Sequence, residues 1–362
     1  MRWPWQRRVS ADVLVLSWCA KTLAFVVGHV LADGSIEVRR FGVERQGIDS
    51  DEDLARRLQG LGLKGYEARV MLRPEQYQLL QIDAPSVAPE ELRSAARYQI
   101  RDMLDVHLDD ITLDVMRVGD GREKGTQHLF VVVATNAVVR GVLDLGRALQ
   151  WNLSVIDIQE TAQRNLQSAL AKRDGRLERA TAALVVGDES QAVFTISANE
   201  ELFYSRRLEL PEGFLTGSWG QSVVAAPVVS DAYAPVEEYV PSYGGGGNAY
   251  GSDYGKASAG SGAQATGDAA AHERAQRFLI EVQRSLDLWD RSWSTLPLAG
   301  LSVYAGERTE ELVQWLSREM GQTVQVMDIN AMFPGFEGGA PGDLAQCWPL
   351  LGALMRTDNR KL

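Results

Sequence analysis

The sequence predicts a mixed α/β protein with two similar lobes. Three apolar runs separated by short polar turns begin at Val13, and the same order of strand, turn, strand, turn and strand returns from Ala183. The last turn of the second set is Asn199–Glu200, and asparagine tolerates the positive φ that a tight hairpin requires. A helical pattern follows each set of strands and would cover one face of its sheet.

Two segments carry apolar residues at helical spacing, and each also has a polar face. They are therefore predicted to be core-facing helices rather than membrane helices. Residues 89–104 begin with a proline, which suits the first turn of a helix, and residues 273–293 form the second segment. The predicted buried stripes are Leu92, Ala96, Ile100 and Met103 in the first helix, and Leu279, Val282, Leu286, Trp289 and Trp293 in the second. Further strand-like runs lie at residues 77–82, 111–118, 129–134 and 154–158.

The composition excludes several classes of function. A formal net charge of −11 argues against nucleic-acid binding, which needs clustered Lys and Arg to replace the counterions of the phosphate backbone. Cys19 and Cys347 are the only cysteines and lie far apart, and the four histidines lack the spacing of zinc ligands. The sequence also carries no nucleophile elbow, P-loop or dinucleotide fingerprint. We therefore expect no metal site and no catalytic residue.

Neither end of the chain predicts a membrane-spanning helix. Residues 1–8 read MRWPWQRR, and the apolar run that follows is too broken for a signal peptide and too short to span a bilayer. Trp3 and Trp5, with the arginines beside them, either touch an anionic membrane surface or form a solvated end. Residues 347–356 are also too short to cross a bilayer, and we expect them to pack as a final helix on the second lobe.

Residues 217–271 differ in composition from the rest of the chain. They are rich in Gly, Ser, Ala and Tyr and contain few large aliphatic residues. Such a segment cannot bury enough apolar surface to offset the entropy lost on ordering, so we expect a flexible insertion. The alternative is a self-associating tract held together by its tyrosines.

Three stretches, in this order, resemble the PilM/MshI family of type IV pilus biogenesis, whose fold is that of actin and FtsA. Residues 79–118 resemble the family's short strand, EEL-led helix and LDDITLD-type strand. Residues 130–170 are similar to its strand, helix, strand and next helix, and residues 278–329 resemble its EIQRSLDFF-type helix with the segment that follows. The resemblance covers nearly the whole chain apart from the low-complexity insertion, and no single motif is diagnostic.

The resemblance implies an α/β actin-like ATPase (ribonuclease H-like) fold with two lobes and an inserted small subdomain. The first lobe would span residues 9–175 and include the subdomain at about 70–160. The second lobe would comprise residues 176–216 and 272–362, with residues 217–271 as the flexible insertion between its two parts.

In the active ATPases of this fold, two hairpin turns hold the phosphates and magnesium, and a glycine-rich turn approaches the adenosine. The corresponding turns here are LSWCAK at residues 16–21, VVGDESQ at 185–191 and AGERTEE at 305–311. The first turn lacks the acidic residue, and we expect Trp18 to obstruct the approach. The second carries Asp188 and Glu189 where phosphates would lie, and like charges repel. The third keeps Gly306, but charged residues follow it.

We therefore expect a degenerate nucleotide site, no ATP hydrolysis and no cofactor. The alternative is ATP bound with magnesium in a shifted register. In that case Lys21 would contact a phosphate, Asp188 would hold the metal and Gly306 would approach the adenosine.

The resemblance implies a scaffold on the cytoplasmic face of the inner membrane, peripheral to it, in an MSHA-like pilus machine with other pilus assembly proteins. Its partner would be the cytoplasmic N-terminal tail of a bitopic PilN-like inner-membrane protein, held in a groove near the inserted subdomain. An acidic surface suits a basic tail. The alternatives are a nucleotide-dependent switch or ATPase of the same machine, and a cytoplasmic platform component of type II secretion.

Overall fold

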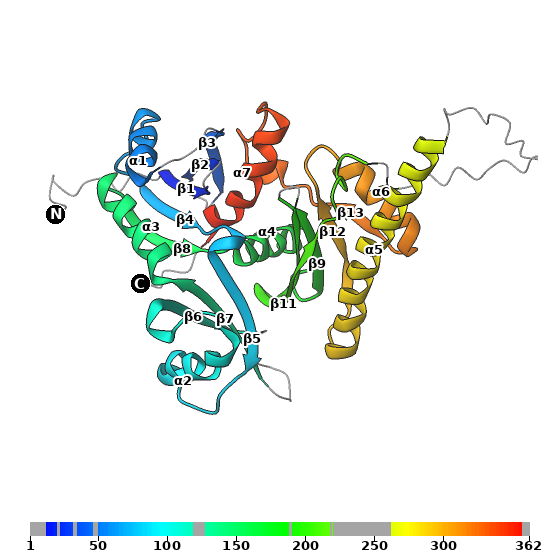
Figure 1. The fold of residues 1–362 in the computed structure, drawn as a ribbon, viewed down its shortest axis with the longest axis horizontal. Helices are drawn as coiled ribbons and strands as arrows, with labels where there is room; N and C mark the ends of the chain where they lie inside the picture. Colours follow the sequence, from blue (N-terminus) through cyan, green and yellow to red (C-terminus); the bar gives the residue numbers. More distant parts are fainter. Residues whose placement is uncertain are drawn as a thin grey trace, which may run out of the picture.

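The chain forms two five-stranded sheets, with helices between and outside them, and a three-stranded sheet set to one side (Figure 1). The computed structural model describes residues 12–19, 22–31, 35–45, 50–118, 127–187, 190–217, 219 and 262–356. The first and second sheets belong to the two lobes, and the third sheet is inserted into the sequence of the first lobe.

The two large sheets have the same topology. In spatial order, the first sheet contains β3 (Ile36–Glu44), β2 (Leu23–Val30), β1 (Asp12–Trp18), β4 (Glu67–Met71) and β8 (Asn152–Asp157). The second contains β11 (Glu201–Glu209), β10 (Gln191–Ala198), β9 (Ala180–Val186), β12 (Leu298–Tyr304) and β13 (Val324–Val326). The central strand of each sheet pairs antiparallel with the strand after it and parallel with a later strand. The lobes therefore repeat one three-strand meander followed by parallel strands.

Local sequence accounts for several element boundaries. Asn199 and Glu200 have φ of 52° and 66°, as a tight turn between β10 and β11 requires. Ser50 accepts a hydrogen bond from the backbone N–H of Asp53 and so caps the first turn of α1 (Asp51–Gly60). Gly321 ends α6 (Thr309–Met320) in the left-handed region, where a β-carbon would be strained.

Two helices, α4 (Gln159–Arg173) and α7 (Pro341–Leu354), lie between the large sheets. Their apolar side chains share one buried cluster with residues of both sheets, including Val15 and Val185. We expected residues 347–356 to pack on the second lobe, and the structure corrects this, because α7 also contacts β1, β2 and β3 of the first lobe. Every residue from Cys347 to Leu354 is buried, as expected for a helix that is apolar on all sides.

The face of α4 toward the second lobe is polar but buried. The Gln163 side-chain amide donates to the carbonyls of Ala183 and Val193, each at 3.1 Å. One turn later, the Gln167 amide donates to the carbonyl of Thr181 at 2.9 Å. Burying a side-chain amide costs folding free energy unless the amide forms such hydrogen bonds. These bonds therefore fix α4 of the first lobe against the β9–β10 hairpin of the second.

The third sheet contains, in spatial order, β5 (Tyr77–Asp83), β7 (His128–Thr135) and β6 (Ile111–Arg117). The helix α2 (Leu92–Gln99) covers one face and buries Leu92, Ala96 and Ile100. Met103, expected on the same stripe, is 49% exposed because a 3-10 turn, Arg101–Met103, replaces the last helical turn. The helix α3 (Asn136–Ala148) and β8 lie outside the third sheet, and β8 joins the first one, so the separate unit is shorter than residues 70–160.

The long helix α5 (Gly262–Ser292) packs on the outer face of the second sheet. The predicted stripe is buried from Leu279 to Trp289, and Trp293 is partly buried. The insertion was predicted to span residues 217–271, but α5 begins within that range, at Gly262. Trp219, also within that range, is buried in the second lobe. Residues 218 and 220–261, and with them the predicted tether or tyrosine tract, lie outside the described residues.

Across the part of the chain that the structure describes, no helix is both long and apolar enough to span a membrane. Trp3 and Trp5, the predicted membrane contacts, lie outside the described residues.

Candidate functional site

The ends of β1 and β9 face one hollow between the two lobes. Ser17 and Gly187 line it from these strands, and Gln159 lines it from the first residue of α4. Gln346 and Pro349 of α7 also line it, and the third turn contacts the same helix, because a β-carbon built on Gly306 would lie 3.4 Å from the Ala345 side chain. The structure therefore brings the predicted turns of both lobes to one place.

This hollow is small. Its volume is about 20 Å³, which holds roughly one water molecule. Pockets for drug-sized ligands and cofactors are usually about 300–1,000 Å³. A β-carbon built on Gly187 would lie 3.6 Å from Nε2 of Gln159, so this amide approaches the second turn closely. The hollow is lined by polar side chains of the chain itself, among them Gln159 and Gln346.

Trp18 does not obstruct the hollow, contrary to our expectation. Successive side chains of a strand point to opposite faces. Val15 belongs to the cluster between the lobes, whereas Leu16 belongs to the cluster on the far side of the first sheet. Trp18 packs on that far side with Leu16, and Ser17 faces the hollow. The hollow is lined instead by residues 71–74 at the end of β4, by the β9–β10 hairpin, and by α4 and α7.

Arg308 of the third predicted turn contacts other residues of the second lobe. This guanidinium lies 3.9 Å from the ring centre of Trp219 and donates to the carbonyls of Leu215 and Gly217 at 2.6 and 2.7 Å. Gly306 has φ of 57°, and its carbonyl accepts from the Thr309 hydroxyl. The positive charge at this turn is therefore committed to contacts within the second lobe.

Lys21 and Asp188, the residues that would contact ATP and magnesium in a shifted register, lie outside the described residues, as does Glu189. Among the described residues, no group of His, Cys, Asp and Glu side chains could hold a metal ion. Sequence reasoning missed Ser17, which is 3% exposed and whose hydroxyl finds no hydrogen-bond partner within the described structure. The alternation of β1 could have placed it toward the hollow.

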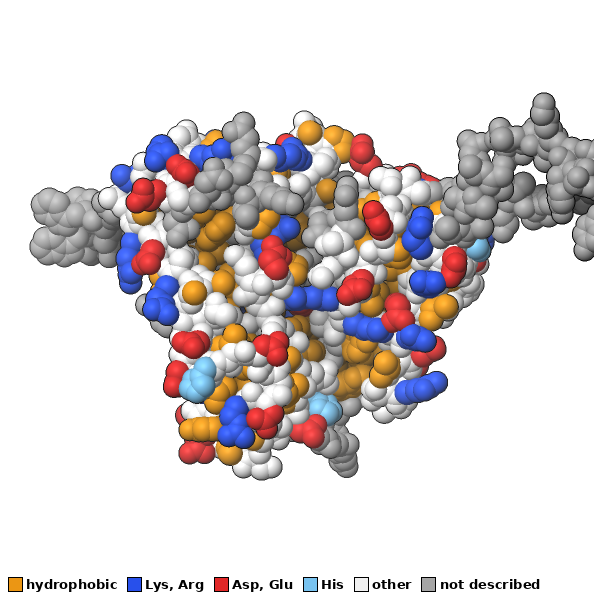
Figure 2. Space-filling model, in the orientation of Figure 1, with side chains coloured by type: hydrophobic (Ala, Val, Ile, Leu, Met, Phe, Trp, Pro, Cys, Tyr) orange, Lys and Arg blue, Asp and Glu red, His pale blue; other side chains and the backbone are white. Residues whose placement is uncertain are grey.

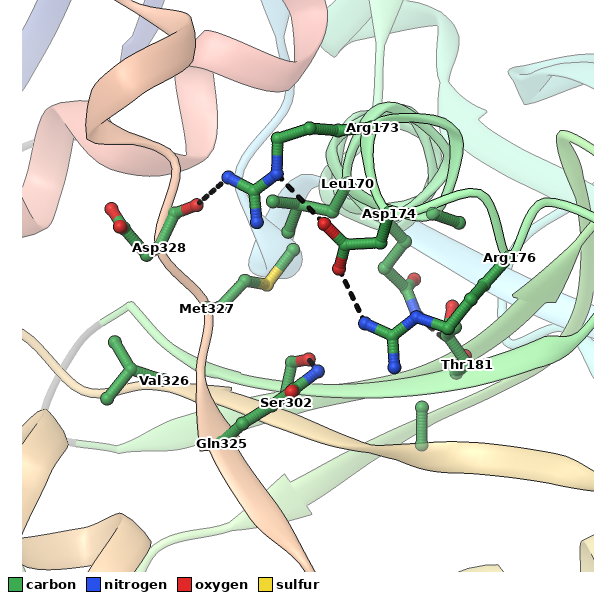
Figure 3. A pocket seen from close by; sticks show the side chains of 13 residues that line it. Leu170, Arg173, Asp174, Arg176, Thr181, Ser302, Gln325, Val326, Met327 and Asp328 are labelled. Atoms are coloured by element: carbon green, nitrogen blue, oxygen red, sulfur yellow. Dashed lines mark hydrogen bonds and ion pairs between the residues drawn. The ribbon is translucent and has the colours of Figure 1, made fainter.

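A second pocket, of about 60 Å³, lies at the opposite end of α4 (Figure 3). Asp174 lies between Arg173 and Arg176 and pairs with both, and Arg173 also donates to the carbonyl of Asp328. Hydrogen bonds from Arg176 and Arg173 lower the pKa of Asp174 below its usual value. The charges in this pocket satisfy one another, which favours a structural role.

A third feature is a set of partly buried apolar side chains from the third sheet, α3 and β8, all packed against one core cluster of the first lobe. We call it the apolar ledge, and it comprises Leu79, Met116, Val132, Val138, Val139, Leu153 and Ile156. Two of these residues lie on β8, an edge strand that pairs with β4 on one side only. A strand edge beside apolar side chains offers both backbone hydrogen bonds and hydrophobic contacts to an extended peptide.

Comparison with known proteins gives structural matches only. No protein-family model and no curated protein matches the sequence. A chain of the PilM-PilN type IV pilus biogenesis complex is 14% identical, matches 97% of this chain over 100% of its own length and superposes with a TM-score of 0.61. The fold is actin-like. This confirms the fold class expected from the sequence.

Two further solved structures match less well. A Bacteroides thetaiotaomicron protein with an actin-like ATPase fold and unknown function is 7% identical and covers 90% of this chain and 95% of its own, with a TM-score of 0.46. The cytoplasmic domain of EpsL, an inner-membrane component of the Vibrio cholerae type II secretion system, is 16% identical and covers 55% of this chain and 71% of its own. Its TM-score is 0.38.

The buried end of α7 makes stability sensitive to alkaline pH. Cys347 is fully buried between the lobes, and this burial raises the pKa of its thiol to about 12. Burial also raises the pKa of Tyr304, whose ring stacks on Trp348 with centres 4.2 Å apart. In the unfolded chain the thiol ionises near pH 8.5, roughly its ordinary pKa. The unfolded state then binds fewer protons than the folded state, so stability falls as pH rises from there toward 12.

We expect the free energy of unfolding to fall above about pH 8.5, with Cys347 contributing up to about 1.4 kcal/mol per pH unit. Urea titrations across this range would measure it. The Cys347→Ala variant should show a shallower slope, whereas Cys19→Ala, at a partly exposed thiol, should keep the slope of the parent. Equal slopes for all three proteins would contradict the assignment to Cys347.

Proposed function

We propose that this protein is a cytoplasmic scaffold of a type IV pilus assembly machine of the MSHA kind, docking on the N-terminal tail of a PilN-like inner-membrane protein. The observation that carries the proposal is the match to a chain of the PilM-PilN complex over 97% of this chain. That match takes in both lobes and leaves no large part of the described fold unaccounted for. The proposal places the protein peripheral to the inner membrane.

The apolar ledge is the proposed docking site for the tail. Met116 and Val132 of the third sheet and Ile156 of β8 present partly buried apolar surface, which an apolar residue of the tail could cover. The free edge of β8 could pair with an extended backbone. The net charge of −11 would attract a tail with basic juxtamembrane residues.

We further propose that the protein acts without hydrolysing ATP. The 20 Å³ hollow between the lobes and the commitment of Arg308 to Trp219 support this. One observation favours the rival nucleotide-dependent switch. The unpartnered hydroxyl of Ser17 and the Arg73 side chain line the same hollow, and both could contact an anion if the lobes opened.

Isothermal titration of the full chain with synthetic PilN-like N-terminal peptides, and separately with Mg-ATP, tests both proposals. We expect peptide binding with a Kd of about 1 μM and no heat from Mg-ATP. Met116→Glu, on the ledge, should abolish peptide binding, because it would place a charge in an apolar contact. The matched control is Val106→Glu, at an exposed apolar residue away from the ledge.

The scaffold proposal fails if no peptide binds, or if Met116→Glu and Val106→Glu bind the peptide equally well. Clear heat from Mg-ATP would instead restore the switch, and peptide binding that requires the nucleotide would unite the two functions.

A further inference from the structure

A hollow of about 430 Å³ separates the third sheet from the second lobe. Residues 77–80 of β5 line one side, and residues 205–207 of β11 line the other. Figure 1 shows β5 on the side of the third sheet that faces β11. This hollow is distinct from the small hollow between the lobes, and it shares only Leu79 with the apolar ledge. The proposed function uses the β8 edge of the ledge and not the strand edges that face this hollow.

The backbone edges of two strands face this hollow. Both β5 and β11 are edge strands, each pairing with one neighbour in its own sheet. Side chains of consecutive strand residues point to opposite faces, so a hollow lined by consecutive residues runs along the backbone edge. Each edge presents N–H and C=O groups that no strand of the described chain pairs. An extended peptide is the partner whose hydrogen bonds match such edges.

Contacts between the sheets hold the two edges in place. At one end, Arg207 of β11 donates to the Pro74 carbonyl at 2.9 Å and to Glu160 at 3.0 Å. At the other end, Leu202 of β11 packs with Val118 and Phe130 of the third sheet unit. These contacts preorganise the hollow, which lowers the entropy cost of binding.

Arg206 gives the hollow a charge preference. The whole chain is acidic, yet two consecutive residues of this edge, Arg206 and Arg207, are arginines. Arg207 is committed to the buried Glu160, whereas the Arg206 side chain is 36% exposed. Its described contacts are an ion pair with Glu281 and a long 3.4 Å bond to Ser285. A guanidinium has five donors, so Arg206 can donate hydrogen bonds to a second carboxylate.

We infer that this hollow docks an extended segment of a partner polypeptide as an added strand, with an acidic side chain of that segment on Arg206. The site goes beyond the proposed function, because the tail of the PilN-like protein is expected at the apolar ledge and is expected to be basic. It would let the scaffold hold a second component of the assembly while the tail is bound.

The test uses a random library of displayed peptides about nine residues long, enough for one strand. The library is selected on the full chain and counter-selected on the Arg206→Glu variant. Enriched peptides should carry Asp or Glu, and should slow amide hydrogen exchange in both Tyr77–Asp83 and Glu201–Glu209. Their affinity should fall by about tenfold in Arg206→Glu. It should be unchanged in Arg147→Glu, the same charge reversal at an exposed residue of α3.

The Arg206→Gln variant removes the charge without reversing it, and it replaces Arg206→Glu if circular dichroism shows that the latter is misfolded. The inference is overturned if selection enriches no acidic peptide, if bound peptides protect neither strand, or if both Arg206 variants bind them as the parent does. Titration with the PilN-like tail should be unaffected by these variants. Failure here and failure of the scaffold proposal are therefore separate results.

Discussion

Replacing Gly352 with alanine is expected to lower the free energy of unfolding by about 3 kcal/mol or more. A β-carbon at Gly352 of α7 would lie 2.0 Å from the carbonyl oxygen of Ala162 in α4. The obstacle is backbone, which cannot rotate aside as a side chain can. The two helices would have to separate, and the buried cluster between the lobes would lose contacts.

Urea unfolding followed by circular dichroism would measure the loss. Gly141→Ala is the matched control, because Gly141 is also helical and a β-carbon there would meet no atom within 4 Å. Alanine exceeds glycine in helix propensity, so the control should gain about 0.5–1 kcal/mol. The close crossing of α4 and α7 would be refuted if Gly352→Ala unfolded at the same urea concentration as the parent.

Local sequence was sufficient for most of the fold. The Asn199–Glu200 turn and the stripe from Leu279 to Trp289 obey short-range rules, and the structure shows each where it was expected. The position of α7 could not be obtained this way. Periodicity identifies a helix that is apolar on all sides as buried, but it does not say which sheet the helix meets. In the structure, α7 near the end of the sequence contacts strands near its beginning, and the Cys347 thiol donates to the Phe25 carbonyl of β2.

The candidate site shows the same limit. Strand alternation places Ser17 toward the hollow and Trp18 away from it. The expectation that Trp18 obstructs the turn rested on the size of its side chain alone. Other contacts join distant segments. Arg308 meets Trp219, and Arg207 meets Glu160, through packing that no local rule encodes. Single-sequence patterns predict where the turns are, and tertiary packing decides what fills them.

Replacing Arg207 with leucine is expected to cost about 3–5 kcal/mol, because it would leave a buried charge without its partner. Glu160 is fully buried at the start of α4 and pairs with Arg207 of the second lobe. The Tyr77 hydroxyl also donates to Glu160, and burial raises the pKa of Tyr77 well above its usual value, so it keeps its proton. The Arg207 guanidinium lies 4.4 Å from the Tyr77 ring centre, so one cluster joins the third sheet, α4 and β11.

The double variant Glu160→Gln with Arg207→Leu should recover more than half of the loss, because a neutral amide needs no counter-charge and still accepts from Tyr77. Arg93→Leu is the control. Arg93 and Asp114 form an ion pair in which both side chains are about two-thirds exposed, at 64% and 67%. Water already screens that pair, so its loss should cost about 0–1 kcal/mol in the same urea titration. If Arg207→Leu and Arg93→Leu lowered stability equally, the buried cluster would not be what holds the third sheet to the second lobe.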